Sequence, residues 1–191
     1  MKFERAEIAD VVVCEPVVHG DDRGYFFESF RIDKLADFLG FKPEFVQDNE
    51  SKSSRGVLRG LHFQLPPHAQ SKLVRVIEGE VLDVAVDMRK GSPTFGQSVS
   101  LLLSAENKKQ LFIPRGFAHG FIVLSEKAIF SYKVDNYYNQ SSERGVAYND
   151  PSINIDWHLM KDEFLMSTKD QRLPLLEDVT ELFSSTVNYY D

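Results

Sequence analysis

The chain has 191 residues, and its 22 Lys and Arg against 29 Asp and Glu give a formal charge of −7, which argues against non-specific nucleic-acid binding. No apolar run approaches the ~20 residues of a membrane span, and the single cysteine, Cys14, cannot close an intramolecular disulfide. A hydrophobic fraction of 42% is too high for a disordered chain. We therefore expect a globular protein, and the lack of a signal-peptide pattern at the start predicts a cytoplasmic location.

Short alternating or β-branched runs, separated by turn residues, dominate the chain and predict an all-β sandwich or barrel. The first run covers residues 11–16. A turn over 19–24 then leads into an aromatic-rich strand over 25–30.

One helix is expected early in the chain, over residues 33–39. Its apolar residues share one face, Asp33 can cap its first turn and Gly40 can end it.

The middle of the chain predicts paired strands. Residues 72–77 and 81–87 flank Glu78-Gly79-Glu80, which is typical of a hairpin. The second run alternates with period two, which indicates a strand rather than a helix. Further strands are expected over 56–64, 97–103, 110–113, 120–124 and 128–134.

The pattern loosens after Asn136, where we expect loops with short strands or turns. The apolar residues of 175–183 have roughly helical spacing, which predicts a helix packed on the barrel. The chain is thus interpreted as one domain over 1–191, with a C-terminal appendage from about residue 175.

The sharpest local motif is Pro114-Arg115-Gly116-Phe117-Ala118-His119, which resembles the second motif of the cupin barrels. Metal-binding cupins place two histidines one residue apart in the partner motif, where this chain has His62 and Gln64. Two histidines are a poor metal site, because catalytic metals usually have about three protein ligands. We therefore predict no metal.

Several motifs, in order along the chain, are similar to those of the dTDP-4-dehydrorhamnose 3,5-epimerase family of cupin-fold enzymes. The resemblance runs from about residue 10 to 176. It implies a mainly β, cupin-type (double-stranded β-helix or jelly-roll) barrel with a few short helices. The motifs lie at 22–30, 47–49, 56–64, 70–76, 114–121, 132–138, 143–145 and 167–170.

The resemblance implies epimerisation of dTDP-4-dehydro-6-deoxy-D-glucose at C3 and C5, in dTDP-L-rhamnose synthesis. Both carbons flank a ketone, so the chemistry needs a base, an acid on the opposite face and a group that stabilises the enolate. No electrons are lost, so no cofactor is expected. No metal is needed if a cation holds the enolate.

By this resemblance His62 is the base, Asp170 orients its imidazole, Tyr132 is the acid and Lys72 stabilises the enolate. Without the resemblance, a histidine or tyrosine within a strand is more often structural, and an aspartate after a lysine is usually a solvated turn residue.

The family match also implies binding residues and a homodimer in which an N-terminal strand is exchanged or packed across the interface. The matching positions are Arg23, Arg59 and Lys169 for the pyrophosphate, Tyr138 for the thymine, Glu28, Gln47 and Asn49 for the nucleotide part, Glu143 for the ligand, and His119 for the sugar or phosphate.

Three alternatives stay open at this point. A 3-epimerase of the same family would keep the same base and acid. A metal-dependent cupin would contain stoichiometric metal. The third is a cupin that binds sugar nucleotides without catalysis, in which the base His62 and the acid Tyr132 would have no role.

Overall fold

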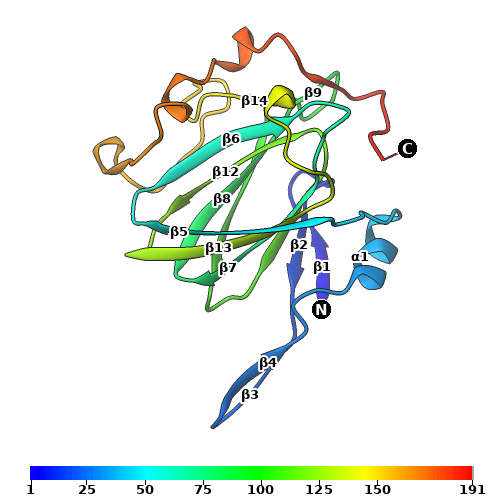
Figure 1. The fold of residues 1–191 in the computed structure, drawn as a ribbon, viewed down its shortest axis with the longest axis vertical. Coiled ribbons are helices and arrows are strands. Elements are labelled where there is room, and N and C mark those ends of the chain that lie inside the picture. Colours follow the sequence, from blue (N-terminus) through cyan, green and yellow to red (C-terminus); the bar gives the residue numbers. More distant parts are fainter. Residues whose placement is uncertain (191) are drawn as a thin grey trace.

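The computed structural model describes residues 1–190, and Figure 1 shows two antiparallel sheets facing each other. This confirms the predicted β-barrel. The six-stranded sheet has the order β1-β2-β11-β7-β13-β5 and the five-stranded sheet the order β10-β8-β12-β6-β14. The strands are β1 (Lys2–Arg5), β2 (Val12–Glu15), β5 (Gln47–Ser54), β6 (Leu58–Gln64), β7 (Lys72–Glu78), β8 (Glu80–Asp87), β10 (Ser98–Ser104), β11 (Gln110–Ile113), β12 (Phe117–Val123), β13 (Lys127–Val134) and β14 (Glu143–Gly145).

The predicted hairpin of β7 and β8 is wrong. The chain does turn at Gly79, where φ is +80° and a Cβ would collide with the carbonyl oxygen of Lys127. However, β7 pairs with β11 and β13, whereas β8 pairs with β10 and β12. The turn therefore carries the chain from one sheet to the other. Such a corner and a hairpin have the same local sequence pattern.

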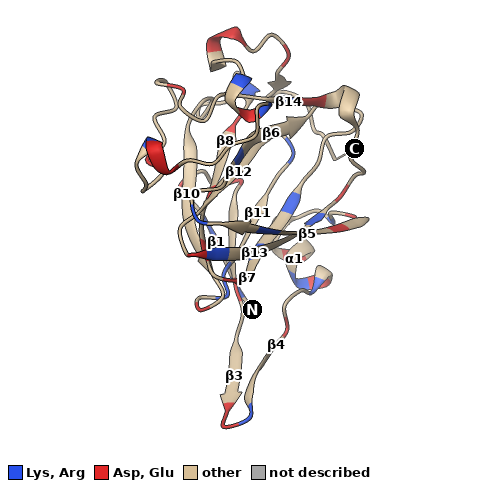
Figure 2. Cartoon of the chain, turned by 60° about the vertical axis from the view of Figure 1, so that its left-hand side comes forward, with Lys and Arg blue, Asp and Glu red and all other residues tan. Residues whose placement is uncertain are grey.

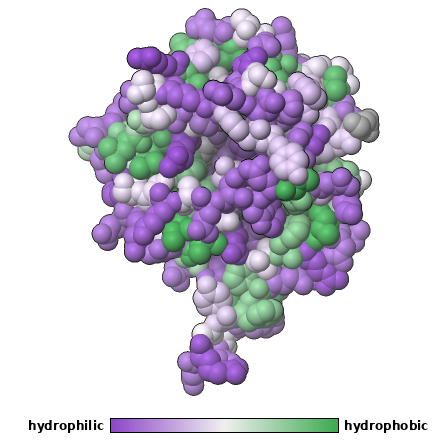
Figure 3. Space-filling view, in the orientation of Figure 1, coloured by the Kyte–Doolittle hydropathy of each residue, from purple (hydrophilic) through white to green (hydrophobic). Residues whose placement is uncertain are grey.

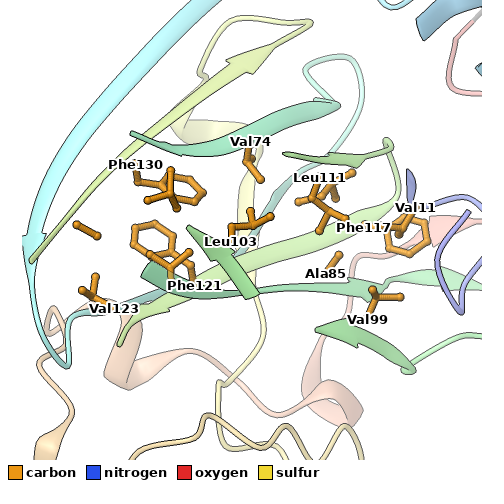
Figure 4. Packing of buried hydrophobic residues seen from close by; sticks show 14 of the residues in the cluster. Val11, Val74, Ala85, Val99, Leu103, Leu111, Phe117, Phe121, Val123 and Phe130 are labelled. Carbon is orange, nitrogen blue, oxygen red and sulfur yellow. The ribbon is translucent and has the colours of Figure 1, made fainter. Parts of the chain in front are cut away.

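Both faces of β8 are buried, so its period-two pattern separates two cores. Val81 and Ala85 point into the space between the sheets, where they join Val74, Phe121 and Phe130 (Figure 4). The opposite face of β8 belongs to a second core, the outer core, which the C-terminal segment covers. It contains Leu82, Val84 and Val86 of this strand, and Met88 directly after it.

The helix predicted over 175–183 is wrong. The segment forms a single 3-10 turn, η4 (Leu176–Asp178), and a short strand, β15 (Phe183–Ser184), parallel to β9 (Arg89–Lys90). Its apolar side chains still pack on the outer core. Nine residues make at best a marginal helix, so contact with the sheet decides the conformation.

The N-terminal region has a hairpin of β3 (Val18–Asp21) and β4 (Gly24–Phe27), and then α1 (Ile32–Leu39). The helix ends as predicted, at Gly40 with φ +83°. Asp33 is not its cap, because the helix begins after Arg31 and Asp33 already lies in the first turn, where it binds the Arg31 guanidinium.

The β3–β4 hairpin projects from the body as a narrow arm in Figures 1 and 3. Charged residues of both signs lie at its tip (Figure 2). Its apolar residues Val18, Tyr25 and Phe26 are exposed. Within residues 1–190 these side chains stay largely uncovered, although the Lys108 ammonium lies 3.9 Å from the centre of the Tyr25 ring.

The polar strand β5 was not predicted, because its sequence QDNESKSS has no apolar alternation. The loose segment after Asn136 is as expected, with the short strand β14 and the 3-10 turns η1 (Gln140–Ser142), η2 (Lys161–Glu163) and η3 (Asp170–Arg172). No helix among residues 1–190 is long and apolar enough to cross a membrane.

Two neighbouring leucines on β10 test the inner core. Leu103 is fully buried between the sheets, whereas Leu102 is 40% exposed. We expect Leu103→Ala to lower the free energy of unfolding by about 2–5 kcal/mol, because it leaves a cavity. Denaturant unfolding measures this loss. Leu102→Ala is the matched control and should cost less than about 1 kcal/mol; equal losses would contradict the assigned faces.

Candidate functional site

A large hollow lies between the two sheets, at the end of the barrel where residues 165–170 pass by. It is a cavity of about 560 Å³ with walls from β5, β6, β7, β12 and β13. A second cavity of about 340 Å³ shares part of this lining. The residues common to both are Asn49, His62, Lys72 and Tyr132.

His62 on β6 is bonded to a carboxylate brought from far along the chain. Its Nε2 lies 2.7 Å from Oδ1 of Asp170, which begins η3 and is 5% exposed. Burial raises the pKa of Asp170, but the bond to His62 and other donors outweighs it, so that pKa lies below its usual value. Asp170 is therefore ionised. It fixes Nε2 as the protonated nitrogen, which leaves Nδ1 free to accept a proton.

Tyr132 approaches the cavity from the opposite sheet, since β13 belongs to the six-stranded sheet and β6 to the five-stranded one. It packs beside Phe130, with ring centroids 6.0 Å apart. Burial raises its pKa above the ordinary value, although Arg59 acts in the opposite direction. Tyr132 is therefore a protonated phenol that can donate.

Lys72, the first residue of β7, lines both cavities. Burial lowers its pKa to about 8, against the attraction of Asp83 and Glu143, which raises it. The group is thus mainly cationic at neutral pH, and its side chain is only partly exposed. A poorly hydrated cation stabilises a nearby negative charge more strongly than one in solvent.

A second imidazole–carboxylate pair lies at the wall of the larger cavity, which His119 lines. His119 Nε2 is 2.8 Å from Oδ2 of Asp83, and both side chains are buried. Burial lowers the pKa of His119, and the nearby Lys72 adds to this effect against the attraction of Asp83. His119 is therefore a neutral imidazole. Asp83 is fully buried and therefore faces the interior of the protein.

The predicted ligand-binding positions on this side of the molecule gather at the two cavities. Gln47 donates to Oδ1 of Asn49 at 2.8 Å on β5. The Glu143 carboxylate accepts from the Tyr138 hydroxyl at 2.9 Å and pairs with Lys169 at 2.5 Å. Arg59 lines the larger cavity and reaches Ser53 Oγ at 3.3 Å.

Arg23 and Glu28 do not reach the cavity of their own chain. Arg23 lies at the tip of the β3–β4 arm, where its side chain is 89% exposed and pairs with Asp21. Glu28 follows the arm and lies 3.8 Å from both Arg31 and Lys34. One chain thus brings together all the predicted site residues except these two.

Sequence reasoning missed Gln64 as a supporting residue, although it had marked the position as the place of the second cupin histidine. The Gln64 amide donates to the carbonyl oxygens of His68 and Tyr137 and accepts from the backbone N–H of Asn139. It therefore holds the backbone on both sides of Tyr138. Among residues 1–190, no group of three or more His, Cys, Asp or Glu side chains is placed to hold a metal ion.

Comparisons with known proteins agree on one family. Residues 5–178 match the family model described as dTDP-4-dehydrorhamnose 3,5-epimerase. The enzyme of that name from Shigella flexneri is 57% identical over 170 residues, which are 89% of this chain and 93% of the relative.

Two solved structures are informative. The 3,5-epimerase from Legionella pneumophila, in complex with dTDP-4-keto-L-rhamnose, has a TM-score of 0.92, 48% identity, and coverage of 96% of this chain and 97% of its own. A 3'-monoepimerase from Streptomyces bikiniensis, in complex with dTDP-quinovose, has a TM-score of 0.88, 32% identity, and coverage of 95% and 93%.

The protonation of Lys72 can be measured directly. We expect one lysine to titrate near pH 8, as a cation below that pH and a neutral amine above it, because burial lowers its pKa. NMR of protein labelled with ¹³C at the lysine ε-carbon measures the transition. Lys72→Met should remove it, and Lys127→Met, which changes an exposed lysine paired with Glu78, should leave it. The same transition in the Lys72→Met protein would contradict the assignment.

Proposed function

Since the chain belongs to the dTDP-4-dehydrorhamnose 3,5-epimerase family, we propose that it inverts C3 and C5 of its dTDP-sugar with His62, Tyr132 and Lys72. The enzyme is an isomerase with a cupin-type barrel. It converts dTDP-4-dehydro-6-deoxy-D-glucose to dTDP-4-dehydro-L-rhamnose for dTDP-L-rhamnose synthesis.

The ketone at C4 makes the reaction a proton exchange. Nδ1 of His62 removes the proton from C3 or C5, and the C–H electron pair moves to the C4 oxygen to form an enolate. The ammonium of Lys72 stabilises the negative oxygen. The Tyr132 hydroxyl then delivers a proton to the opposite face of the same carbon. One proton leaves and one arrives, so the steps balance without a cofactor or a metal.

The observation that carries this proposal is the placement of base and acid on opposite sheets, across one cavity that a partly buried lysine also lines. Inversion requires the two proton transfers to occur on opposite faces of one carbon. Two facing sheets supply such an arrangement, whereas two groups on one sheet approach a substrate from the same side. His119 is neutral and near Lys72, and we assign it to binding the sugar or phosphate.

The nucleotide end of the substrate is assigned to residues of both cavities, with the thymine at the smaller one and the pyrophosphate at the larger one. Tyr138 is 56% exposed and offers an aromatic face on which the thymine can stack. Arg59 and Lys169 supply the positive charge for the pyrophosphate. The remaining polar contacts to the nucleotide come from Gln47, Asn49 and Glu143.

We also propose that the enzyme is a homodimer, because its β3–β4 arm exposes apolar residues and carries Arg23 away from its own cavity. In a two-fold dimer, each chain makes the same contacts with its partner that the partner makes with it. The arm of one chain would then bring Arg23 and Glu28 to the other chain's pocket. The cytoplasmic location and the single domain over 1–191 stay predictions.

The alternative with a specific observation in its favour is epimerisation at C3 alone. The similar Streptomyces bikiniensis structure is a 3'-monoepimerase, so the fold itself does not set the number of inverted carbons. Incubation of the substrate in D₂O distinguishes the two, since the 3,5-epimerase introduces deuterium at both carbons. Exchange at C3 only would contradict the double epimerisation.

Removal of the base and of the acid should have different effects. His62→Asn should lower kcat by about 10²–10⁴-fold and slow deuterium exchange equally, because no other group removes the proton. Tyr132→Phe should lower product formation similarly and leave much of the exchange, because His62 can return a deuteron to the face it came from. NMR of the sugar in D₂O measures both.

Tyr137→Phe is the matched control, since the Tyr137 side chain is 63% exposed. This substitution should leave the rates of product formation and of deuterium exchange unchanged. Loss of exchange in Tyr132→Phe as complete as in His62→Asn would contradict the division of roles.

The exchange of Arg23 between chains can be tested by complementation. Arg23→Ala and His62→Asn chains, carrying different affinity tags, are coexpressed and the hybrid dimer is isolated. The hybrid should have about half the wild-type activity, because one of its two sites receives both native residues. Each parent homodimer should be nearly inactive.

A hybrid of Lys72→Met and His62→Asn chains is the matched control. Both residues lie in the pocket of their own chain, so neither site is complete and no activity should return. Failure of the first hybrid to exceed its parents would contradict the contribution of Arg23 to the partner's site.

A further inference from the structure

The ends of three strands that carry site residues meet at one partly buried polar cluster. It is made of Ser71, Arg115, Asp135 and Tyr190. Ser71 directly precedes Lys72 on β7, and Asp135 directly follows β13, which carries Tyr132. Arg115 lies two residues before β12, which carries His119. Tyr190 comes from the C-terminal tail, beyond the residues 5–178 that match the family model.

The bonds in this cluster close a ring. The backbone N–H of Arg115 donates to the Tyr190 hydroxyl oxygen at 2.9 Å, and that hydroxyl lies 2.7 Å from Ser71 Oγ. The backbone N–H of Ser71 donates to Oδ1 of Asp135 at 2.6 Å. The Arg115 guanidinium closes the ring on Oδ2 of the same carboxylate at 3.1 Å.

Tyr190 completes this ring. Its oxygen accepts from Arg115, so its proton is free for Ser71. Burial raises its pKa to about 12, and the phenol therefore stays protonated and able to donate. Without the Tyr190 hydroxyl, the backbone N–H of Arg115 and the hydroxyl of Ser71 would each lose a hydrogen-bond partner. Ser71 is fully buried, so water cannot replace that partner.

The tail is held in place by ring contacts as well. The Tyr190 ring packs on Phe41 with centroids 4.0 Å apart, and the Arg115 guanidinium lies 5.2 Å from the Tyr190 ring centre. The carbonyl oxygen of Tyr189 accepts from the same guanidinium at 2.6 Å. The tail thus docks as a strap across the strand ends.

We propose that Tyr190 is a positioning residue for the epimerase reaction, which ties the C-terminal tail to Ser71 and Arg115 and so fixes the Lys72 ammonium. This inference rests on the role proposed above for Lys72. Ser71 is the residue next to Lys72, so a shift of its backbone moves the start of β7 and the ammonium with it. An enolate-stabilising charge loses its effect quickly when it is misplaced.

The test compares two adjacent tyrosines of the tail. Tyr190→Phe keeps the ring on Phe41 and removes only the hydroxyl from the cluster. Tyr189→Phe is the matched control, because the Tyr189 hydroxyl accepts from Ser184 within the tail itself. We expect Tyr190→Phe to lower kcat about tenfold with little change in KM, since Lys72 acts on the enolate and not on the bound substrate. Tyr189→Phe should leave kcat unchanged.

The ¹³C titration of Lys72 provides a readout that a merely structural role would not move. Tyr190→Phe should raise the Lys72 pKa from about 8 toward its ordinary value, because a looser β7 end admits water. Ser71→Ala removes the other hydroxyl of the same bond and should give the same two changes. The double variant should be no worse than either single one.

A lowered melting temperature with unchanged kcat and unchanged Lys72 titration in both single variants would overturn the proposal. The titration does not depend on turnover. The two failures are therefore distinguishable. If the catalytic role of Lys72 is wrong, Lys72→Met will keep the wild-type kcat. If the positioning role of Tyr190 is wrong, Tyr190→Phe will leave the Lys72 titration unchanged.

Discussion

The structure depends on keeping charged groups inside a β-barrel, where each must have a partner or lose its charge. Asp170 is paired with His62, Glu143 with Lys169, and Asp83 with His119. Within residues 1–190, by contrast, Lys72 takes part in no ion pair, and burial lowers its pKa to about 8. The pairs hold the acids in place, and the cation is left available for a substrate.

The two imidazole–carboxylate pairs have the same chemistry but different surroundings. The His62 side chain is 26% exposed and opens onto the cavity, whereas that of His119 is 7% exposed and lies beside Lys72. A base must reach its substrate and exchange its proton with solvent afterwards, which favours His62. Burial next to a cation keeps His119 neutral, which suits it to donating or accepting a hydrogen bond. Environment rather than residue type therefore separates the two roles.

Sequence patterns located the apolar strands well because alternation depends on local burial. They failed where the structure is decided by distant contacts. The pattern of β5 is polar, the turn at Gly79 leads to another sheet, and the tail takes its conformation from the surface that it covers. The bond between His62 and Asp170 spans 108 residues, and only the family resemblance suggested it. The net charge of −7 likewise describes the whole chain, whereas Arg59, Lys72 and Lys169 converge on one cavity.

Gln64 shows why this barrel differs from metal-binding cupins at the position of the second histidine. Its amide makes three bonds, two as donor to the carbonyl oxygens of His68 and Tyr137 and one as acceptor from the Asn139 N–H. A neutral imidazole has one donor and one acceptor, so a histidine here would leave at least one of these backbone groups without its partner. A histidine that bound a metal would have even less to offer them. Support of the loop that carries Tyr138 and ligation of a metal are thus competing uses of one position, and this chain has the residue that serves the loop.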